Sequence, residues 1–208
     1  MMQAVFEHDL LGVTVVDIGS ADGASVAWID RMGSRIPIDV DVAALAPGGV
    51  CGSALALPLR DDAVPAAAVL DVVEHFPDDL GLLLEVHRVL RPGGRLVLSV
   101  PAYQWAWSSQ DVDAGHYRRY TRAQIVARLT TAGFAVDRAT YAFAATFGFF
   151  VVNRVVPRLL GRSTGGGTQT GGRAARVLTA LCRADTWVLG RRDLPFGSSV
   201  FVTAHKPR

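Results

Sequence analysis

The chain has 208 residues, half of them apolar and 19% charged, which fits one globular domain over residues 1–208 and excludes a disordered chain. Its one lysine, Lys206, lies near the C-terminal end. A phosphate-binding Gly-Lys-Ser/Thr loop, a pyridoxal Schiff base and a Tyr-x-x-x-Lys reductase pair are excluded, because each needs a lysine inside the domain. Two cysteines, Cys51 and Cys182, predict a reducing, cytoplasmic location. Charged residues within Met1–Leu10 interrupt the apolar core that a signal peptide needs.

The net charge of +2 is unevenly distributed along the chain. Residues 1–115 carry a net charge of −10 and residues 116–208 a net charge of +12. This asymmetry indicates either two halves that attract each other across one domain or a basic surface for an anionic substrate or membrane.

Strands and helices are predicted to alternate along most of the chain. Short apolar runs rich in β-branched residues predict strands: Val13–Ile18, Ile36–Val40, Val50–Gly52, Ala66–Val73, Leu96–Val100, Phe134–Tyr141 and Ser199–His205. Helical spacing of apolar residues predicts helices: Ala24–Arg31, Asp78–Leu90, Thr121–Thr131 with Thr121 as N-cap, and Ala174–Leu189. The alternation predicts a parallel sheet with helices on both faces and a ligand at the carboxyl ends of its strands.

Two segments interrupt this pattern. Tyr141–Val152 contains no charged residue and is too short to span a bilayer. We expect this segment to have one of three roles: to line a pocket, to form a homodimer face, or to lie in a membrane interface as a peripheral contact. Gly161–Arg173 holds six glycines and predicts a flexible linker over residues 161–173.

A glycine-rich turn follows the first predicted strand. The turn holds Gly19, Ala21 and Gly23, preceded by Asp17. Such a turn at a helix N-terminus directs N–H groups at a negatively charged part of a ligand. Asp39 ends the second strand, where a carboxylate accepts the hydroxyl hydrogens of a ribose. Together they indicate a ligand that contains adenosine, although an ordinary strand-to-helix turn is the simpler explanation of the glycines.

Asp71, Glu74 and His75 follow the fourth strand. A helical turn beginning there would place all three on one face. Three roles are open for these residues: a general acid/base group, three ligands of a divalent cation, or only capping and packing. Further along, aromatic residues of the loop after the fifth strand precede Asp111, His116 and paired arginines. This loop is either a lid over the site or a cover for the sheet edge.

These motifs, taken in order, resemble a known family. They are VVDIGSADG, IDVD, LALPLRDD, LDVVEHFPDD, VHRVLRPGGRLVLSVPAY, GHYRRYT and AGF, between Val13 and about Tyr141. The set resembles the class I S-adenosylmethionine-dependent methyltransferases, in the small-molecule branch similar to ubiquinone-biosynthesis enzymes. The resemblance implies an α/β fold with a Rossmann-like, doubly wound, seven-stranded sheet, mostly parallel with an antiparallel last strand.

The resemblance also implies the cofactor, S-adenosyl-L-methionine, and the residues that bind it. Its methionine end would lie at Asp17, Gly19, Ala21 and Gly23, and its sulfonium beside Asp71 and Val72. Asp39 and Val40 would bind the ribose, and Ser53 and Ala54 would border the adenine. Ala21 and Ser53 replace the glycine and aspartate that are usual in the family, and the N-terminal helical cover is expected to be nearly absent.

The implied activity is transfer of a methyl group to an oxygen or nitrogen of a small-molecule or lipid-linked acceptor. His75, His116 and Glu74 are the candidate acid/base residues, and we expect no metal, because Asp71 is one methylene shorter than the glutamate of metal-binding relatives. No nucleic-acid partner is expected. The alternative is a non-catalytic domain of the same fold that acts as a scaffold for a partner enzyme.

Overall fold

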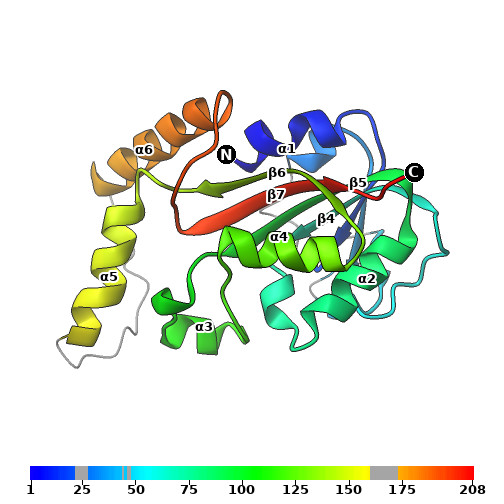
Figure 1. The fold of residues 1–208 in the computed structure, drawn as a ribbon, viewed down its shortest axis with the longest axis horizontal. Helices are drawn as coiled ribbons and strands as arrows, with labels where there is room; N and C mark the ends of the chain where they lie inside the picture. The colour runs from blue at the N-terminus through cyan, green and yellow to red at the C-terminus, as the bar shows by residue number, and fades with distance from the viewer. Residues whose placement is uncertain (22–27, 44, 46–47, 160–172) are drawn as a thin grey trace.

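Within the described residues of the computed structural model, which are 1–21, 28–43, 45, 48–159 and 173–208, seven strands form one sheet (Figure 1). The strands are β1 (Val15–Ile18), β2 (Arg35–Asp39), β3 (Val50–Cys51), β4 (Val64–Leu70), β5 (Leu90–Pro101), β6 (Ala135–Ala142) and β7 (Ser199–His205). Their order is β3-β2-β1-β4-β5-β7-β6. β7 pairs antiparallel with both β5 and β6, and the other pairs are parallel. The predicted fold class is therefore confirmed.

The centre of the sheet is β4, as its nearly continuous apolar sequence predicts. Ala66, Ala67 and Ala68 are fully buried there, and their small side chains let covering elements approach closely. The strand order reverses between β1 and β4, so the turns that follow these two strands lie next to each other. This is the position at which parallel sheets bind ligands.

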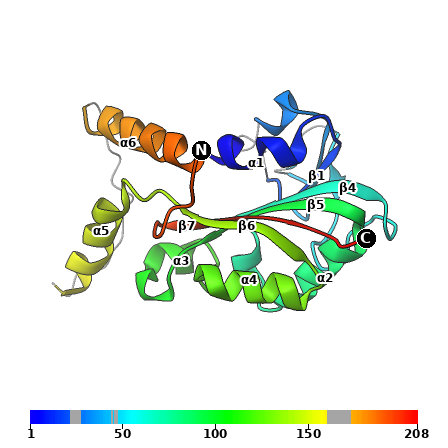
Figure 2. The ribbon, with the colours of Figure 1, turned by 45° about the horizontal axis from the view of Figure 1, so that its top comes forward.

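Helices cover the sheet on both sides (Figure 2). They are α1 (Met2–Leu10), α2 (Asp79–Val89), α3 (Ser109–Asp113), α4 (Arg122–Thr131), α5 (Phe147–Leu159) and α6 (Arg173–Leu189). α1 and α6 lie on one side, and α2 and α4 on the other. Of the residues that the structure describes, no helix is both long and apolar enough to cross a membrane.

The starts of α2 and α4 are fixed by capping residues, of which Thr121 was predicted as an N-cap. The Asp78 side chain accepts the N–H of Gly81 at 2.8 Å. At α4, the Thr121 hydroxyl accepts the N–H of Gln124, whose side chain accepts the N–H of Thr121 in return. Each such cap stabilises its helix by about 1 kcal/mol, which explains why both starts are readable from sequence.

The expectation of almost no N-terminal cover is wrong. α1 packs against β5 and β7, and its Phe6 and Leu10 are fully buried. The helix has no side-chain cap and only a weak apolar periodicity, so its local sequence does not predict it. It forms because its apolar side chains pack against the sheet, so its stability comes from tertiary contacts.

Other predicted boundaries shift. The predicted strand Ala66–Val73 ends at Leu70, and Val73–His75 forms a 3₁₀ turn instead. Ile29–Arg31 is likewise a 3₁₀ turn, and residues 24–27 of the helix predicted there lie outside the described residues. The loop after β5 contains one short helix, α3, that was not predicted.

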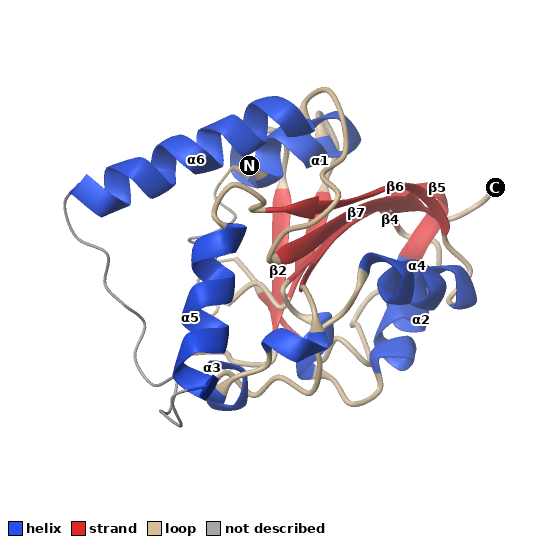
Figure 3. Ribbon diagram, turned by 60° about the vertical axis from the view of Figure 1, so that its left-hand side comes forward, coloured by secondary structure: helices blue, strands red, loops and turns tan. Residues whose placement is uncertain are grey.

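The uncharged stretch Tyr141–Val152 is divided between the end of β6 and the start of α5. α5 and α6 extend beside the sheet, with α3 next to α5 (Figure 3). Asp185 of α6 is buried and accepts the N–H of Ala145 with both carboxylate oxygens at 3.1 Å. This contact joins α6 to the segment that leads into α5. Residues 161–172 of the predicted linker lie outside the described residues.

Candidate active site

The turn after β1 depends on a close approach between two strand ends. Gly19 has a φ of +71°, and a Cβ atom there would lie 2.6 Å from the side chain of Val72, which follows β4. A side chain at position 19 would therefore both clash and strain the backbone. Ala21 has a φ of +43°, a conformation that few residues other than glycine adopt.

Ala21 is held in this conformation by Asp39. The Asp39 Oδ2 atom accepts the Ala21 N–H at 2.8 Å, and Oδ1 accepts the Asp41 N–H at 3.0 Å. Each carboxylate oxygen can accept a further hydrogen bond. The end of β2 therefore presents a fixed carboxylate to the space between the turns.

These turns enclose a pocket of about 410 Å³ at the carboxyl ends of the strands. We call it the strand-end pocket. Its lining includes seven of the predicted cofactor residues: Gly19, Ala21, Asp39, Val40, Ala54, Asp71 and Val72. Among the described residues, Gly52, His75 and Phe76 also line it. Gly52 was not among the predicted cofactor residues, although a glycine at the end of a predicted strand beside Ser53 was a readable signal.

Two of the predicted cofactor residues that the structure describes, Asp17 and Ser53, are not among those that line the pocket. Asp17 is 2% exposed and pairs with Arg35 at 3.0 Å. Burial raises the pKa of Asp17, and Arg35 lowers it only in part. The Ser53 hydroxyl accepts the N–H of Leu55 and so closes a turn. Gly23 lies outside the described residues.

Asp71 lies where the pocket meets β4. Its backbone has a φ of +55°, which is a strained value for an aspartate. Asp71 is exposed to the pocket, but desolvation by the protein around its carboxyl group raises the pKa of that group, against the lowering effects of Ser99 and His116. The strain at Ala21 and Asp71 faces the same pocket, as is common at functional sites.

The three candidate acid/base residues come together next to the pocket. One side-chain ligand atom from each of Glu74, His75 and His116 lies within 4.8 Å of the others. The rings of His75 and His116 meet edge to face, with centroids 4.6 Å apart. His75 also lines the strand-end pocket, so it connects the pocket to this cluster.

Glu74 is the most buried member of the cluster. It is fully buried, and neither of its carboxylate oxygens has a hydrogen-bond partner among the described residues. Burial raises its pKa to about 9, and the charge of Asp71 adds to the shift. Glu74 is therefore a neutral carboxylic acid at pH 7. The pKa of His75 is lowered by burial and by His116, which favours a neutral imidazole.

Asp111 orients His116 and was not among the predicted site residues. It is 1% exposed, and its Oδ1 atom lies 3.0 Å from His116 Nδ1 and 2.7 Å from Arg119 Nε. Burial opposes ionisation of Asp111, but the hydrogen bond and charge of Arg119 outweigh it and lower the pKa. The charged carboxylate fixes the proton of His116 on Nδ1 and leaves Nε2 as the acceptor. In the sequence, the spacing Asp-x₄-His-x₂-Arg was a signal from which Asp111 could have been predicted.

The cluster differs from the metal triplet considered from sequence. A bound cation would have Glu74, His75 and His116 as ligands, because Asp71 is not part of the group. The 3₁₀ turn at Val73–His75 separates Asp71 from the other two, so the three do not share a helical face. The expectation that Asp71, Glu74 and His75 lie on one face is corrected.

The aromatic loop after β5 packs against later parts of the chain. Tyr103 stacks on Tyr141 of β6 at 5.2 Å and contacts Phe147 of α5 at 5.6 Å. The same loop carries His116 to Glu74, whose carbonyl accepts the N–H of Tyr117 at 2.7 Å. The loop therefore covers the sheet end and also completes the cluster.

Part of the chain is similar to known proteins. Residues 16–98, from β1 into β5, match the family described as a methyltransferase domain. A protein of Mycolicibacterium smegmatis described as an S-adenosylmethionine-dependent methyltransferase is 30% identical over 141 residues, covering 62% of this chain and 55% of that protein. An uncharacterised methyltransferase of Mycobacterium sp. strain JLS is 31% identical over 132 residues, covering 59% of this chain and 52% of that protein.

The fold agrees with these matches. A methyltransferase-type structure from Bacillus halodurans superposes with a TM-score of 0.64 at 16% identity, covering 100% of this chain and 99% of that one.

Residues 16–98 thus match a methyltransferase domain, and the chain is similar to S-adenosylmethionine-dependent methyltransferases.

The predicted resemblance to S-adenosylmethionine-dependent methyltransferases is confirmed. The likeness to the ubiquinone-biosynthesis branch stays a prediction. The chain spans about half the length of the curated relatives it matches. The match ends within β5, so the loop with Asp111 and His116 and the helices α5 and α6 lie outside the matched domain.

Proposed function

We propose that the protein transfers a methyl group from S-adenosylmethionine to an oxygen or nitrogen of a small-molecule or lipid-linked acceptor, with His116 as the base. The observation that supports this most strongly is that the strand-end pocket and the acid/base cluster share a wall. His75 lines the strand-end pocket and also belongs to the cluster with Glu74 and His116. A methyl group presented at the end of the pocket would thus face a group able to accept a proton.

The residues of the pocket suit S-adenosylmethionine. The backbone at Gly19, Ala21 and Gly23 would receive the methionine end, and Asp39 with Val40 the ribose. Ser53 and Ala54 would border the adenine, while Asp71 and Val72 would lie beside the sulfonium. Asp17 would act from behind the turn through its ion pair with Arg35 rather than by direct contact.

Bound S-adenosylmethionine supplies a methyl group that is already activated for transfer. The protein's share is to align the acceptor and the cofactor, which can contribute about 7 to 11 kcal/mol to lowering the barrier. When the methyl carbon leaves the cofactor sulfur for the acceptor atom, with S-adenosylhomocysteine as the other product, the acceptor O–H or N–H would lose its proton to Nε2 of His116. The Asp111 carboxylate stabilises the resulting imidazolium. Glu74 is neutral at pH 7, so it brings no negative charge into the buried cluster and keeps an O–H donor beside the imidazoles.

Calorimetry with S-adenosylhomocysteine and NAD tests the cofactor assignment. We expect S-adenosylhomocysteine to bind and NAD not to bind. Asp39→Ala removes both the ribose acceptor and the hydrogen bond that holds Ala21, so affinity should fall at least about tenfold. Asp41→Ala is the matched control, because among the described residues this neighbouring carboxylate bonds only to the N–H of Ala43. Tight NAD binding without a response to S-adenosylhomocysteine would refute the assignment.

A screen of acceptors with labelled methyl cofactor tests the reaction. Small alcohols, phenols, amines and lipid-linked forms of each make up the panel. His116→Ala should abolish transfer to acceptors that lose a proton while leaving S-adenosylhomocysteine binding unchanged. Transfer that persists in this variant would assign the base elsewhere.

A further inference from the structure

The outer face of α6 carries an exposed apolar stripe that neither the fold nor the active site uses. It consists of Val177, Ala180, Ala184 and Trp187, all exposed, and we call it the outer stripe. The spacings of three and four residues place them on one side of the helix. Val177 is 59% exposed and Trp187 is 62% exposed. Large apolar residues that are aligned along one helix face in this way mark a contact surface.

A different face attaches α6 to the rest of the protein. Leu189 and Asp185 are buried there, at 1% and 4% exposure, and Asp185 bonds the N–H of Ala145. The helix also contacts α1. The outer stripe is thus not the packing face of α6, and it would remain accessible when the helix is docked.

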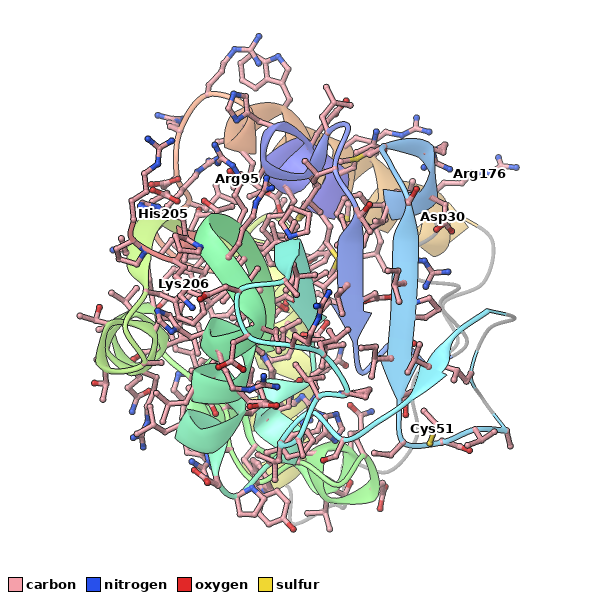
Figure 4. All side chains as sticks on the ribbon, turned by 90° about the vertical axis from the view of Figure 1, so that its right-hand side faces the viewer. Asp30, Cys51, Arg95, Arg176, His205 and Lys206 are labelled. Carbon is pink, nitrogen blue, oxygen red and sulfur yellow. The ribbon has the colours of Figure 1, made fainter. Side chains whose placement is uncertain are left out.

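Basic residues flank the outer stripe. Arg176 and Arg183 are exposed and lie seven residues apart on the same side of α6. The Arg191 guanidinium lies over the Trp187 ring at 4.1 Å. Figure 4 shows Arg176 at the outer rim of the molecule, pointing away from the sheet. The stripe is therefore an apolar surface bordered by three positive charges.

The surrounding sequence carries almost no opposing charge. Residues 143–192 contain eight arginines and a single acidic residue, Asp185, a net charge of +7. That acid is buried against Ala145, so it does not neutralise the surface. The basic excess of the C-terminal half is thus concentrated in α5, α6 and the chain between them. Lysine and glutamate, which are typical of a solvated surface helix, are both missing from residues 143–192.

We propose that the outer face of α6 binds the surface of an anionic lipid bilayer, with Val177 and Trp187 entering the interface and the arginines contacting the headgroups. Helices of this kind combine apolar and indole side chains with a basic border, and each basic residue near an anionic membrane contributes about 1 kcal/mol. Arginine suits the position because its apolar stem can lie along the interface while the guanidinium reaches the headgroups.

Two other occupants fit less well. A second copy of the chain would bring two rows of arginines together, which is unfavourable without acids between them. A nucleic acid would attract the arginines and could stack on Trp187, but it gives no role to Val177 and the alanines. An anionic bilayer satisfies both the charges and the apolar side chains.

Sedimentation of the full chain with lipid vesicles tests the proposal. Vesicles of phosphatidylcholine with phosphatidylglycerol are compared with vesicles of phosphatidylcholine alone. We expect binding to the anionic vesicles and at least about tenfold weaker binding of Arg176→Glu/Arg183→Glu. The matched control is Arg60→Glu/Arg91→Glu, which changes the net charge equally at two exposed arginines outside α6.

A second pair of variants separates insertion from simple charge attraction. Trp187→Ala should also weaken binding, and its loss should persist at high salt, whereas Leu84→Ala should not weaken it. Leu84 is 48% exposed on α2 and serves as a comparable apolar side chain elsewhere. Thermal unfolding of each variant establishes that it is folded, and methyl transfer to a soluble acceptor should be unchanged in all four. A failure of cofactor binding would overturn the proposed function without affecting this result.

Three outcomes would overturn the proposal. One is equal recovery of wild type with anionic and neutral vesicles. Another is equal binding by the α6 charge variant and its control. The third is loss of a concentration-dependent dimer, or of single-stranded RNA binding, in the α6 variants without any effect on vesicle binding.

Discussion

Asp111 decides how the imidazole of His116 can be used. Its carboxylate is held by Arg119 at 2.7 Å and lies 3.0 Å from His116 Nδ1. The same geometry without the negative charge would leave the imidazole oriented less well and its protonated form unsupported. The residue acts through His116 rather than on the acceptor, so it is a positioning residue.

We expect Asp111→Asn to lower kcat by about 100-fold or more, because the amide neither fixes the tautomer nor stabilises the imidazolium. KM for the acceptor should change less than about threefold, and S-adenosylhomocysteine binding should not change. Steady-state kinetics and calorimetry measure these quantities. Asp113→Asn is the control, since this neighbour at the end of α3 is exposed. An unaltered kcat in Asp111→Asn would remove the role given to this pair.

Glu74 makes the protein less stable at alkaline pH. Its pKa is about 9 in the folded protein and ordinarily 4.5, so the folded state holds a proton that the unfolded chain releases. The free energy of unfolding therefore falls as the pH rises from about 5 to about 9. Glu74→Gln cannot ionise and should raise the free energy of unfolding at pH 8 by about 1 to 4 kcal/mol.

Urea unfolding at several pH values measures this effect. Glu85→Gln is the control with the opposite sign, because its pKa is lowered by the hydrogen bond from Arg88. That variant should lose stability above the ordinary pKa of glutamate. If the pH dependence of Glu74→Gln equals that of wild type, Glu74 is ionised in the folded protein.

Activity is expected to persist in the presence of a chelator. Two imidazoles and a carboxylic acid that keeps its proton at pH 7 form a poor site for magnesium, which prefers carboxylate and water oxygens. Methyl transfer measured with and without EDTA should differ by less than about twofold. Loss with EDTA and recovery with a divalent ion would instead assign the cluster to a metal, and a transition metal would then be the first to try.

Helix α1 shows how an element without local signals is specified. The Phe6 ring is fully buried and lies 5.3 Å from the Phe201 ring of β7 and 6.3 Å from that of Trp28. These partners are far apart in sequence, so the helix is stabilised by the assembled sheet. By contrast, α2 and α4 carry their own caps and were predicted nearly to the residue.

Phe6→Ala should lower the free energy of unfolding by about 3 to 5 kcal/mol, because it leaves a cavity between α1 and the sheet. Denaturant unfolding monitored by circular dichroism gives the value. Leu11→Ala, at a side chain that is 64% exposed just after the same helix, should change it by less than about 0.5 kcal/mol. Similar losses in the two variants would mean that α1 does not pack as described.

The last strand, β7, holds the sheet of the whole molecule together. β7 lies between β5 and β6 and pairs with both over its full length, so β6 is connected to the sheet only through it. Ion pairs also join the two halves of opposite charge. Asp79 pairs with Arg118 at 2.9 Å, and Lys206 pairs with Asp62 at 2.7 Å. Attraction between the halves therefore accounts for part of the charge asymmetry, and α6 carries arginines beyond it.

A chain that ends at Gly197 should show no cooperative thermal transition, because removing β7 separates β6 from the rest of the sheet. Calorimetry of this truncation and of one that ends at His205 provides the comparison. The shorter deletion loses only the contacts of Lys206 and the two residues after it, so its transition should remain cooperative. A cooperative transition in both would mean that the sheet is stable without β7.

The sequence by itself determined the order of strands and helices from β1 to β7, because burial in a parallel sheet and helix capping leave local patterns at residues such as Asp78 and Thr121. It also indicated the turn at Gly19 and the carboxylate at Asp39. Only the tertiary structure decided that His116 joins Glu74 and His75, since a loop returns about forty residues later to reach them. It likewise decided that Asp71 stays with the pocket and that α1 exists. Contacts between distant segments leave no periodicity in the chain, and their energy appears only when the sheet is assembled.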